Sequence, residues 1–224
     1  MKQYKMVMFD MDGTIVDSFF CHAGCFQRYL EKYGVLMDKN QISKMMGNTM
    51  DIIFSNTLPK DKQEEALHGL SDFYRTDIDD LVDDMRIIEG SIETIARIKE
   101  KGYLVTLLTN SKKELVERII ERKKIGYLFD MIEPADVDEV DKAMRCKKIF
   151  DRFNVQPFEV LYVGDSSHDV ALARDVGMTS CLIDNETSWV HHESFSGAFI
   201  DPDIAIDHIS KVLDIISPDM QNQG

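Results

Sequence analysis

The chain has 224 residues, of which 44% are hydrophobic, so it is long enough to bury a substantial core as one domain or as one domain carrying an insertion. Its formal net charge of -14 argues against a broad surface for nucleic acids or anionic membranes, because such surfaces need clustered Lys and Arg. An anionic substrate would therefore require a local source of positive charge.

The sequence shows no sign of a targeting or membrane segment. Only the short run 6–9 separates Lys5 from Asp10, which is too little for the apolar region of a signal peptide. No stretch approaches membrane-spanning length. The cysteines are too few and too scattered for a disulfide framework, which predicts a cytoplasmic protein with reduced thiols at Cys21, Cys25, Cys146 and Cys181.

The first predicted element is a buried strand over 6–9, a short apolar run that ends at Asp10. The next stretch, about 19–85, is rich in helix formers and methionine and contains no convincing buried strand, so we predict a helical insertion there. Its acidic end, 77–84, is interpreted as a solvated helix end and hinge rather than a metal site.

After the insertion, apolar strands alternate with amphipathic helices. Near-continuous apolar runs predict strands over 103–108, 160–163 and 179–183, with a weaker candidate at 129–132. Helices are predicted over 91–101, 112–124, 142–153 and 168–175, and a capping-box spacing predicts that the second of these begins at Ser111. The alternation predicts an α/β fold, a parallel sheet with crossover helices on both faces.

The residues that follow the predicted strands carry the candidate chemistry. Ligands of an open parallel sheet bind beyond the carboxyl ends of its strands. The residues at those ends are Asp10, Asp12, Gly13 and Thr14 after the first strand, Thr109, Asn110 and Ser111 after the second, Lys142 before the helix that leads to the third, and Asp165 and Asp169 after the third.

Carboxylates gathered at one sheet edge would repel one another unless a cation lay among them. An all-oxygen set suits a hard ion such as Mg²⁺, which would also supply positive charge for an anion. Lys142 adds a fixed charge, while Thr109 and the amides at the start of the following helix can donate hydrogen bonds to a phosphoryl oxygen. This set predicts an anion pocket that contains an activated carboxylate.

Asp10 and Asp12 are expected to have different roles, because alternate residues of an extended segment point to opposite sides. We expect Asp10 to act as the nucleophile, and Asp12 to protonate the leaving oxygen and later to deprotonate the attacking water. Gly13 allows a sharp turn after the second carboxylate, and the Thr14 hydroxyl can hold that turn in place.

These motifs resemble those of the haloacid dehalogenase superfamily, in its branch of phosphoglycolate phosphatases and beta-phosphoglucomutases. The family's motifs match, in order, at 10–14, at Thr109, at Lys142 and at Gly164-Asp165 with Asp169. The resemblance implies a Rossmann-like core, residues 1–17 and 87–224, with a small α-helical cap, residues 18–86. It also implies Mg²⁺ held by Asp10, the Asp12 carbonyl and Asp165 with support from Asp169, and a phosphate site made by Thr109, Asn110, Lys142 and Gly13.

The chain departs from the family pattern at two places. The family's lysine is usually followed by proline, but here Ala143 follows Lys142, so Lys147 and Lys148 stay open as alternatives. The residue before Gly90 is glutamate where proline is common, which should matter only for the hinge.

The resemblance predicts a Mg²⁺-dependent phosphatase that hydrolyses a small-molecule phosphate monoester, such as phosphoglycolate or a sugar phosphate, through an aspartyl phosphate. A beta-phosphoglucomutase-like mutase is the alternative, supported by His22, because those mutases carry a histidine at the matching offset from the nucleophile. The segment 163–165 lacks the extra acidic residue that such mutases tend to carry. Asp12 argues against a dehalogenase, and the size of the insertion argues against a receiver-like phospho-acceptor.

Substrate specificity is expected to reside in the cap. The candidate residues are Lys44, Asn48 and His22, together with Phe19, Phe20, Gly47 and Thr49, and Lys44 could meet a second anionic group on the substrate. We expect a small-molecule partner and neither nucleic acid nor membrane; the sequence leaves the oligomeric state open, and a monomer is compatible with it.

Three residues near the predicted carboxyl-terminal strands are less informative. His191 and His192 have no carboxylate or cysteine close by in sequence and are interpreted as surface residues. Trp189, the only tryptophan, either borders the site or packs a loop.

Overall fold

The computed structural model describes residues 4–38, 41–42, 45, 50–135, 141–186, 188–191 and 201–216. Its centre is a six-stranded sheet in the order β5-β4-β1-β6-β7-β8. The strands are β1 (Met6–Phe9), β4 (Leu104–Lys112), β5 (Met131–Ala135), β6 (Val160–Gly164), β7 (Thr179–Ile183) and β8 (Ile204–Ile206), and every pairing between neighbours is parallel. The predicted α/β fold class is confirmed.

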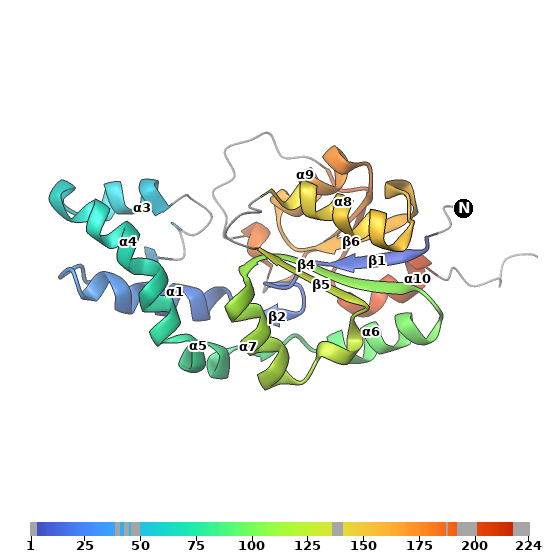
Figure 1. Cartoon of the computed structure of the whole chain (residues 1–224), viewed down its shortest axis with the longest axis horizontal. Helices are drawn as coiled ribbons and strands as arrows, with labels where there is room; N and C mark the ends of the chain where they lie inside the picture. The colour runs from blue at the N-terminus through green and yellow to red at the C-terminus, as the bar shows by residue number, and fades with distance from the viewer. Residues whose placement is uncertain are drawn as a thin grey trace, which may run out of the picture.

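Helices cover both faces of this sheet (Figure 1). One face carries α6 (Ser91–Glu100), α7 (Lys113–Lys123) and α10 (Val212–Ile216), and the other carries α8 (Lys142–Phe153) and α9 (Ser167–Val176). Side chains of β1 alternate between the two faces: Val7 and Phe9 belong to the core under α6, α7 and α10, whereas Met6 and Met8 belong to the core under α8. Burial on both sides explains why these strands are apolar throughout.

The predicted insertion is helical in its described part. Its helices are α1 (Phe19–Glu31), α3 (Met50–Thr57), α4 (Lys60–Thr76) and α5 (Ile78–Asp84), and they lie to one side of the sheet (Figure 1). The short strands β2 (Val16–Asp17) and β3 (Arg86–Ile87) flank these helices in the chain and pair antiparallel with each other. Phe19 and Phe26 of α1 pack in the same hydrophobic cluster as Phe9 of β1, so the insertion shares a core with the sheet.

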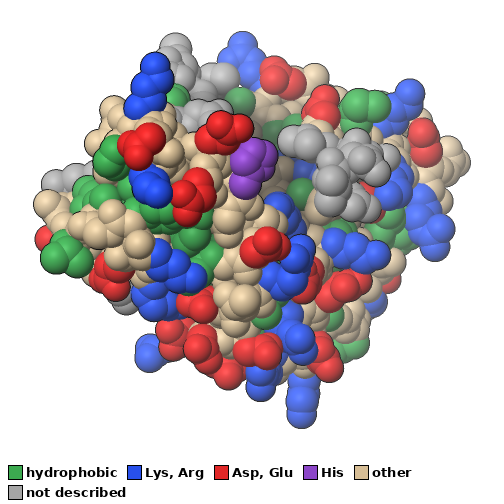
Figure 2. Space-filling view, turned by 60° about the vertical axis from the view of Figure 1, so that its left-hand side comes forward, with side chains coloured by type: hydrophobic (Ala, Val, Ile, Leu, Met, Phe, Trp, Pro, Cys, Tyr) green, Lys and Arg blue, Asp and Glu red, His purple; other side chains and the backbone are tan. Residues whose placement is uncertain are grey.

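Ion pairs also join the insertion to α7. Asp79 of α5 lies 3.1 Å from Nε of Arg118 and 3.4 Å from Nη2 of Arg122, and Asp83 lies 3.4 Å from Nε of Arg122. The face in Figure 2 shows acidic and basic side chains interspersed over the described surface. The acidic end of the insertion is therefore a contact with the core as well as a solvated surface.

One predicted boundary is wrong, and some short elements were missed. Strand β4 continues to Lys112, and α7 begins at Lys113 with no side-chain cap, so Ser111 does not begin a helix. The two-residue strands β2 and β3 and the strand β8 are too short to give a periodic signal. Among the described residues, no helix has both the length and the hydropathy needed to cross a membrane.

Candidate active site

Asp10 stands at the carboxyl end of β1, in the middle of the sheet. Its backbone N–H donates to the carbonyl of Val163 at 2.9 Å, which continues the pairing with β6, and the residue is only 7% exposed. The chain then turns at Gly13, whose φ is +74°. A Cβ at Gly13 would overlap the Asp165 carboxylate and the ring of Trp189, so glycine is needed here for both its conformation and its size.

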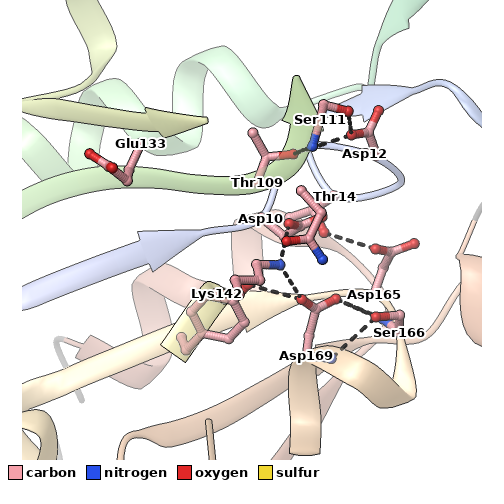
Figure 3. Close-up of polar contacts among 12 residues, drawn as sticks. Asp10, Asp12, Thr14, Thr109, Ser111, Glu133, Lys142, Asp165, Ser166 and Asp169 are labelled. Atoms are coloured by element: carbon pink, nitrogen blue, oxygen red, sulfur yellow. Dashed lines mark hydrogen bonds and ion pairs between the residues drawn. The ribbon is translucent and has the colours of Figure 1, made fainter. Parts of the chain in front are cut away.

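Lys142 is the lysine that the structure brings to this end of the sheet (Figure 3). Its Nζ lies 2.7 Å from Oδ1 of Asp10 and 3.0 Å from Oδ1 of Asp169. Lys142 is the first residue of α8, which Asp141 caps by accepting a hydrogen bond from Ala143 N at 2.8 Å. Alanine in place of the family's proline is thus compatible with this position of the lysine.

The two alternative lysines lie elsewhere. Lys147 is exposed, and Lys148 binds Oε1 of Glu133 at 2.8 Å. The distances to Asp10 and Asp169 therefore single out Lys142 among the three.

Asp165 and Asp169 follow β6 and are both buried. Thr14 Oγ1 donates to Oδ1 of Asp165 at 3.2 Å, and the backbone N–H of Trp189 donates to Oδ2 at 2.7 Å. Asp169 forms a capping box with Ser166 at the start of α9, and the Tyr162 hydroxyl donates to its Oδ1 at 2.9 Å. Backbone and hydroxyl donors thus fix the orientation of both carboxylates.

Asp10, Asp165 and Asp169 form one cluster, in which an oxygen atom of each lies within 4.8 Å of the others. Burial, opposed by Lys142, raises the pKa of Asp10 to about 7, and burial together with the charges of Asp169 and Asp10 raises the pKa of Asp165 well above its usual value. Burial also disfavours the ionised form of Asp169, but Lys142 and hydrogen bonds outweigh it and lower that pKa. A buried all-oxygen cluster with one lysine among three carboxylates fits a hard divalent cation.

Asp12 points away from this cluster, toward Ser111 and Thr109 of β4 (Figure 3). Its Oδ1 accepts a hydrogen bond from Ser18 Oγ at 2.7 Å and lies 3.5 Å from Nε2 of His22, while its Oδ2 accepts from Ser111 Oγ at 2.7 Å. Burial would raise the pKa of Asp12, but the contact with His22 and the two hydroxyl donors outweigh it and lower the pKa. The two carboxylates of the first motif therefore have different surroundings, as the alternation of the chain predicts.

Thr109 and its neighbours close the side of the site at the end of β4. Thr109 is buried, with its Oγ1 3.4 Å from Oδ2 of Asp12, and it accepts a hydrogen bond from Ser111 N at 3.0 Å. Ser111 was interpreted as a helix cap, which is wrong because its hydroxyl binds Asp12 across the site instead. Asn110 is exposed, and its side-chain oxygen accepts a hydrogen bond from Nη2 of Arg145 at 2.6 Å.

The profile of the haloacid dehalogenase-like hydrolase family matches residues 7–183. The chain belongs to this family. The predicted membership of the haloacid dehalogenase superfamily is thereby confirmed, and with it the enzyme class, a hydrolase.

Relatives of this haloacid dehalogenase-like chain span nearly its whole length. Pyrophosphatase PpaX of Bacillus cereus (strain G9842) is 25% identical over 217 residues, which cover 94% of this chain and 95% of the relative. A haloacid dehalogenase-like hydrolase from Streptococcus pneumoniae superposes with a TM-score of 0.81 at 20% identity, covering 96% of this chain and 99% of the other. A protein from Haemophilus somnus 129pt, described as a predicted phosphoglycolate phosphatase, superposes with a TM-score of 0.78 at 21% identity. The match covers 96% of this chain and 99% of the other.

One residue at this haloacid dehalogenase-like site was not predicted, and a second was predicted only as one of two alternatives. Arg145, fully buried on α8, donates to the carbonyl of Thr109 at 2.6 Å; its spacing of three from Lys142 on a helix was the only available signal. Trp189 borders the site, with its ring 4.9 Å from that of Phe19 and 6.4 Å from that of His22. Of the two alternatives left open for Trp189, the structure thus shows the one in which it borders the site.

The remaining predictions have mixed outcomes. His191 is half exposed, but it does have a carboxylate partner, because its Nε2 lies 2.8 Å from Oδ1 of Asp184. The four cysteines are free thiols. The cap candidates Lys44, Asn48, Gly47 and Thr49 lie outside the described residues, as does His192.

Proposed function

We propose that the chain is a Mg²⁺-dependent phosphatase that cleaves a small-molecule phosphate through an aspartyl phosphate on Asp10. The observation that carries this proposal is the convergence of Lys142, Asp165 and Asp169 on Asp10, with Lys142 Nζ at 2.7 Å from its Oδ1. A carboxylate in such surroundings is held in place, shielded from bulk water and offset by positive charge, which are the conditions that a phosphoryl acceptor needs.

Each residue of the site has a role in this proposal. An oxygen of Asp10 attacks phosphorus, the bond from phosphorus to the leaving oxygen breaks, and Asp12 gives that oxygen a proton. The pKa of Asp12 is lowered in the substrate-free site, so this step requires that the negative charge of the bound phosphate raise it. In the second half, Asp12 takes a proton from water, the water oxygen bonds to phosphorus, and the bond to Asp10 breaks to release phosphate. Lys142, Thr109, Asn110 and the backbone at Gly13 would hold the phosphoryl oxygens.

The metal would be held by Asp10, Asp165 and Asp169, whose oxygens already lie within 4.8 Å of one another, with the main-chain carbonyl of Asp12 as a further ligand from the family pattern. When bound, Mg²⁺ supplies positive charge that offsets these carboxylates and polarises a phosphoryl oxygen. An oxygen-only set of this kind favours Mg²⁺ over softer transition metals.

The helical insertion, residues 18–86, is proposed to act as a cap over this site. Two contacts support the proposal: His22 of α1 lies 3.5 Å from Asp12, and Phe19 of α1 packs edge-on against Trp189. A cap in this place would exclude water from the aspartyl phosphate and read the leaving group. The proposed specificity residues of the cap are His22, Lys44 and Asn48, and of these three His22 lies among the described residues.

The substrate class is proposed as small phosphate monoesters of the phosphoglycolate or sugar-phosphate type. One relative is named a pyrophosphatase, and one structural neighbour is named a predicted phosphoglycolate phosphatase. Pyrophosphate and phosphoglycolate are therefore both included among the substrates to be assayed. Free, non-disulfide cysteines support a reducing, cytoplasmic location. A monomer would suffice for this chemistry, since each proposed residue comes from one chain.

The proposal is tested by assaying the purified protein with Mg²⁺ against phosphoglycolate, sugar phosphates, nucleotides and pyrophosphate. Asp10→Asn is the matched variant, because it keeps the shape of the side chain and removes its nucleophilic charge. We expect steady phosphate release that requires both Mg²⁺ and Asp10. Turnover by D10N equal to that of the wild type would overturn the proposed nucleophile.

A phosphosugar mutase is the second candidate, and the contact of His22 with Asp12 favours it. Such an enzyme uses the same nucleophile but returns the phosphoryl group to a sugar. Interconversion of sugar phosphates without release of phosphate would support the mutase, whereas net release from the same substrates would exclude it. Family membership and the helical insertion set aside a receiver-like phospho-acceptor.

A further inference from the structure

Arg145 lies fully buried one helical turn after Lys142, on the same side of α8. Its Nη1 donates to the carbonyl of Thr109 at 2.6 Å and to the carbonyl of Glu133 at 3.4 Å, and its Nη2 donates to Oδ1 of Asn110 at 2.6 Å. One guanidinium thus ties α8 to the carboxyl ends of β4 and β5. The same helix that brings Lys142 to Asp10 also fixes the carboxyl-terminal part of β4.

The surroundings of Arg145 are unusual for a buried cation. Its hydrogen-bond acceptors are neutral oxygens, and among the described residues it forms no ion pair and its Nε has no partner. The nearby carboxylate of Glu133 is bound by Lys148 instead. Burying a charge without a paired carboxylate costs free energy, and an apolar side chain of similar size would fill the same space at lower cost.

The guanidinium lies where it can orient hydrogen-bond donors toward the site, which is a reason for an arginine here in spite of the free-energy cost. Arginine has only donors, so the oxygen of the Asn110 amide must be the atom that faces it, and the two N–H groups of that amide are left as the donors. Thr109, whose carbonyl the same guanidinium binds, supplies a second donor through its hydroxyl. Arg145 also places a positive charge behind these donors, where it would stabilise a bound anion.

We propose that Arg145 is a positioning residue for the phosphoryl group, which orients Thr109 and the Asn110 amide as donors and adds positive charge behind them. This inference rests on the proposed phosphatase function and extends it to a residue that does not touch the substrate. The ligand class is a tetrahedral oxyanion. A residue that only joined α8 to β4 would affect folding but leave oxyanion binding in the folded protein unchanged.

The test compares Arg145→Met, which removes the charge, with Arg145→Lys, which keeps the charge but loses the fork of donors. Arg152→Met is the matched control, because Arg152 is an exposed arginine on the same helix. Tungstate, an oxyanion that cannot be hydrolysed, is titrated with Mg²⁺ present, and binding is read from the rise in unfolding temperature. Hydrolysis of p-nitrophenyl phosphate gives kcat and KM for the same proteins.

We expect R145M to weaken tungstate binding and lower kcat by roughly 10- to 100-fold each, the usual effect of losing charge-assisted hydrogen bonds. R145K should fall between R145M and the wild type, and R152M should match the wild type. Folded R145M with wild-type tungstate affinity and kcat would overturn the proposal. If R145M does not fold, R145K provides the test. A tungstate affinity and a kcat of R145K equal to those of the wild type would then overturn the proposal.

A double-mutant cycle with Asn110→Ala tests the route of the effect. If Arg145 acts through Asn110, the losses in R145M and N110A should not add, and R145M/N110A should resemble the more impaired single variant. Fully additive losses would overturn the positioning role of Arg145 on Asn110. If the wild-type protein binds tungstate but hydrolyses no phosphate ester, the proposed phosphatase function is wrong, and the binding test of Arg145 still applies. If the wild-type protein neither binds tungstate nor hydrolyses a phosphate ester, both proposals are wrong.

Discussion

The Nζ atom of Lys142 lies 2.7 Å from Oδ1 of Asp10, although the two residues are 132 positions apart in the chain. Asp10 follows the central strand β1, and Lys142 begins α8, which packs on the face of the sheet formed by Met6 and Met8. The topology of the sheet thus brings a lysine to a buried carboxylate that two further acidic residues also approach.

Removing the charge of Lys142 should abolish most activity. In Lys142→Met, Asp10 loses its direct cationic partner and the phosphoryl group loses a donor, so we expect kcat to fall roughly 100- to 1000-fold, the scale seen when a donor to a developing anion is removed. Lys148→Met is the control, because Lys148 pairs with Glu133 instead. Comparable kcat values for K142M and wild type, measured with Mg²⁺ and p-nitrophenyl phosphate, would contradict this role.

The pKa of Asp10 predicts how stability depends on pH in the absence of metal. Burial raises this pKa from 3.8 to about 7, so between these values the folded protein holds a proton on Asp10 that the unfolded chain has released. The folded state is therefore favoured at low pH, and this contribution is lost as pH rises through about 7.

Asp10→Asn mimics the protonated carboxyl and tests this dependence. In EDTA, D10N should unfold at a higher temperature than wild type at about pH 8, and this difference should shrink as pH falls and become small near about pH 4. The measurement is thermal unfolding of both proteins across this range. A difference in unfolding temperature that is the same at every pH would show that Asp10 does not titrate as its burial requires.

Gly13 and Gly34 separate backbone strain from crowding at the site. Both have positive φ, +74° and +77°, but a Cβ at Gly13 would overlap Asp165 and Trp189, whereas a Cβ at Gly34 would meet nothing within 4 Å. Gly34→Ala should therefore cost only the conformational term, roughly 1–2 kcal/mol, and keep activity. Gly13→Ala should also displace Asp165 and lose at least about 100-fold in kcat. Equal activity in the two folded variants would refute the crowding argument.

Trp189 should report on metal binding. It is the only tryptophan in the chain, and its backbone N–H donates to Oδ2 of Asp165 at 2.7 Å. A cation that draws Asp165 toward Asp10 would shift this segment, so Mg²⁺ should change the tryptophan emission in a saturable way. Asp165→Asn serves as the control and should lose the change at the same Mg²⁺ concentrations. Emission that ignores Mg²⁺ in the wild type, or responds equally in D165N, would count against the site.

The sheet and the carboxylate cluster could be predicted because their signals are local. An apolar run followed directly by Asp10 or by Gly164-Asp165 indicates both a buried strand and a polar group at its carboxyl end. Ser111 could not be predicted in this way, because its local spacing matches a helix cap. Its hydroxyl instead donates to Asp12, 99 residues away in the chain, and strand β4 continues to Lys112. The contacts of Arg145 with β4 and of Trp189 with Phe19 join distant segments of the chain, so the sequence could at most suggest them.

The most direct test of the central claim is to look for phosphate on Asp10 itself. Wild-type protein is mixed with Mg²⁺ and excess substrate, quenched in acid during turnover, digested, and the peptide that contains Asp10 is examined by mass spectrometry. We predict that this peptide carries one phosphoryl group, which is absent from D10N treated in the same way. Rapid release of phosphate with no phosphoryl group on Asp10 at any time of quenching would contradict the account.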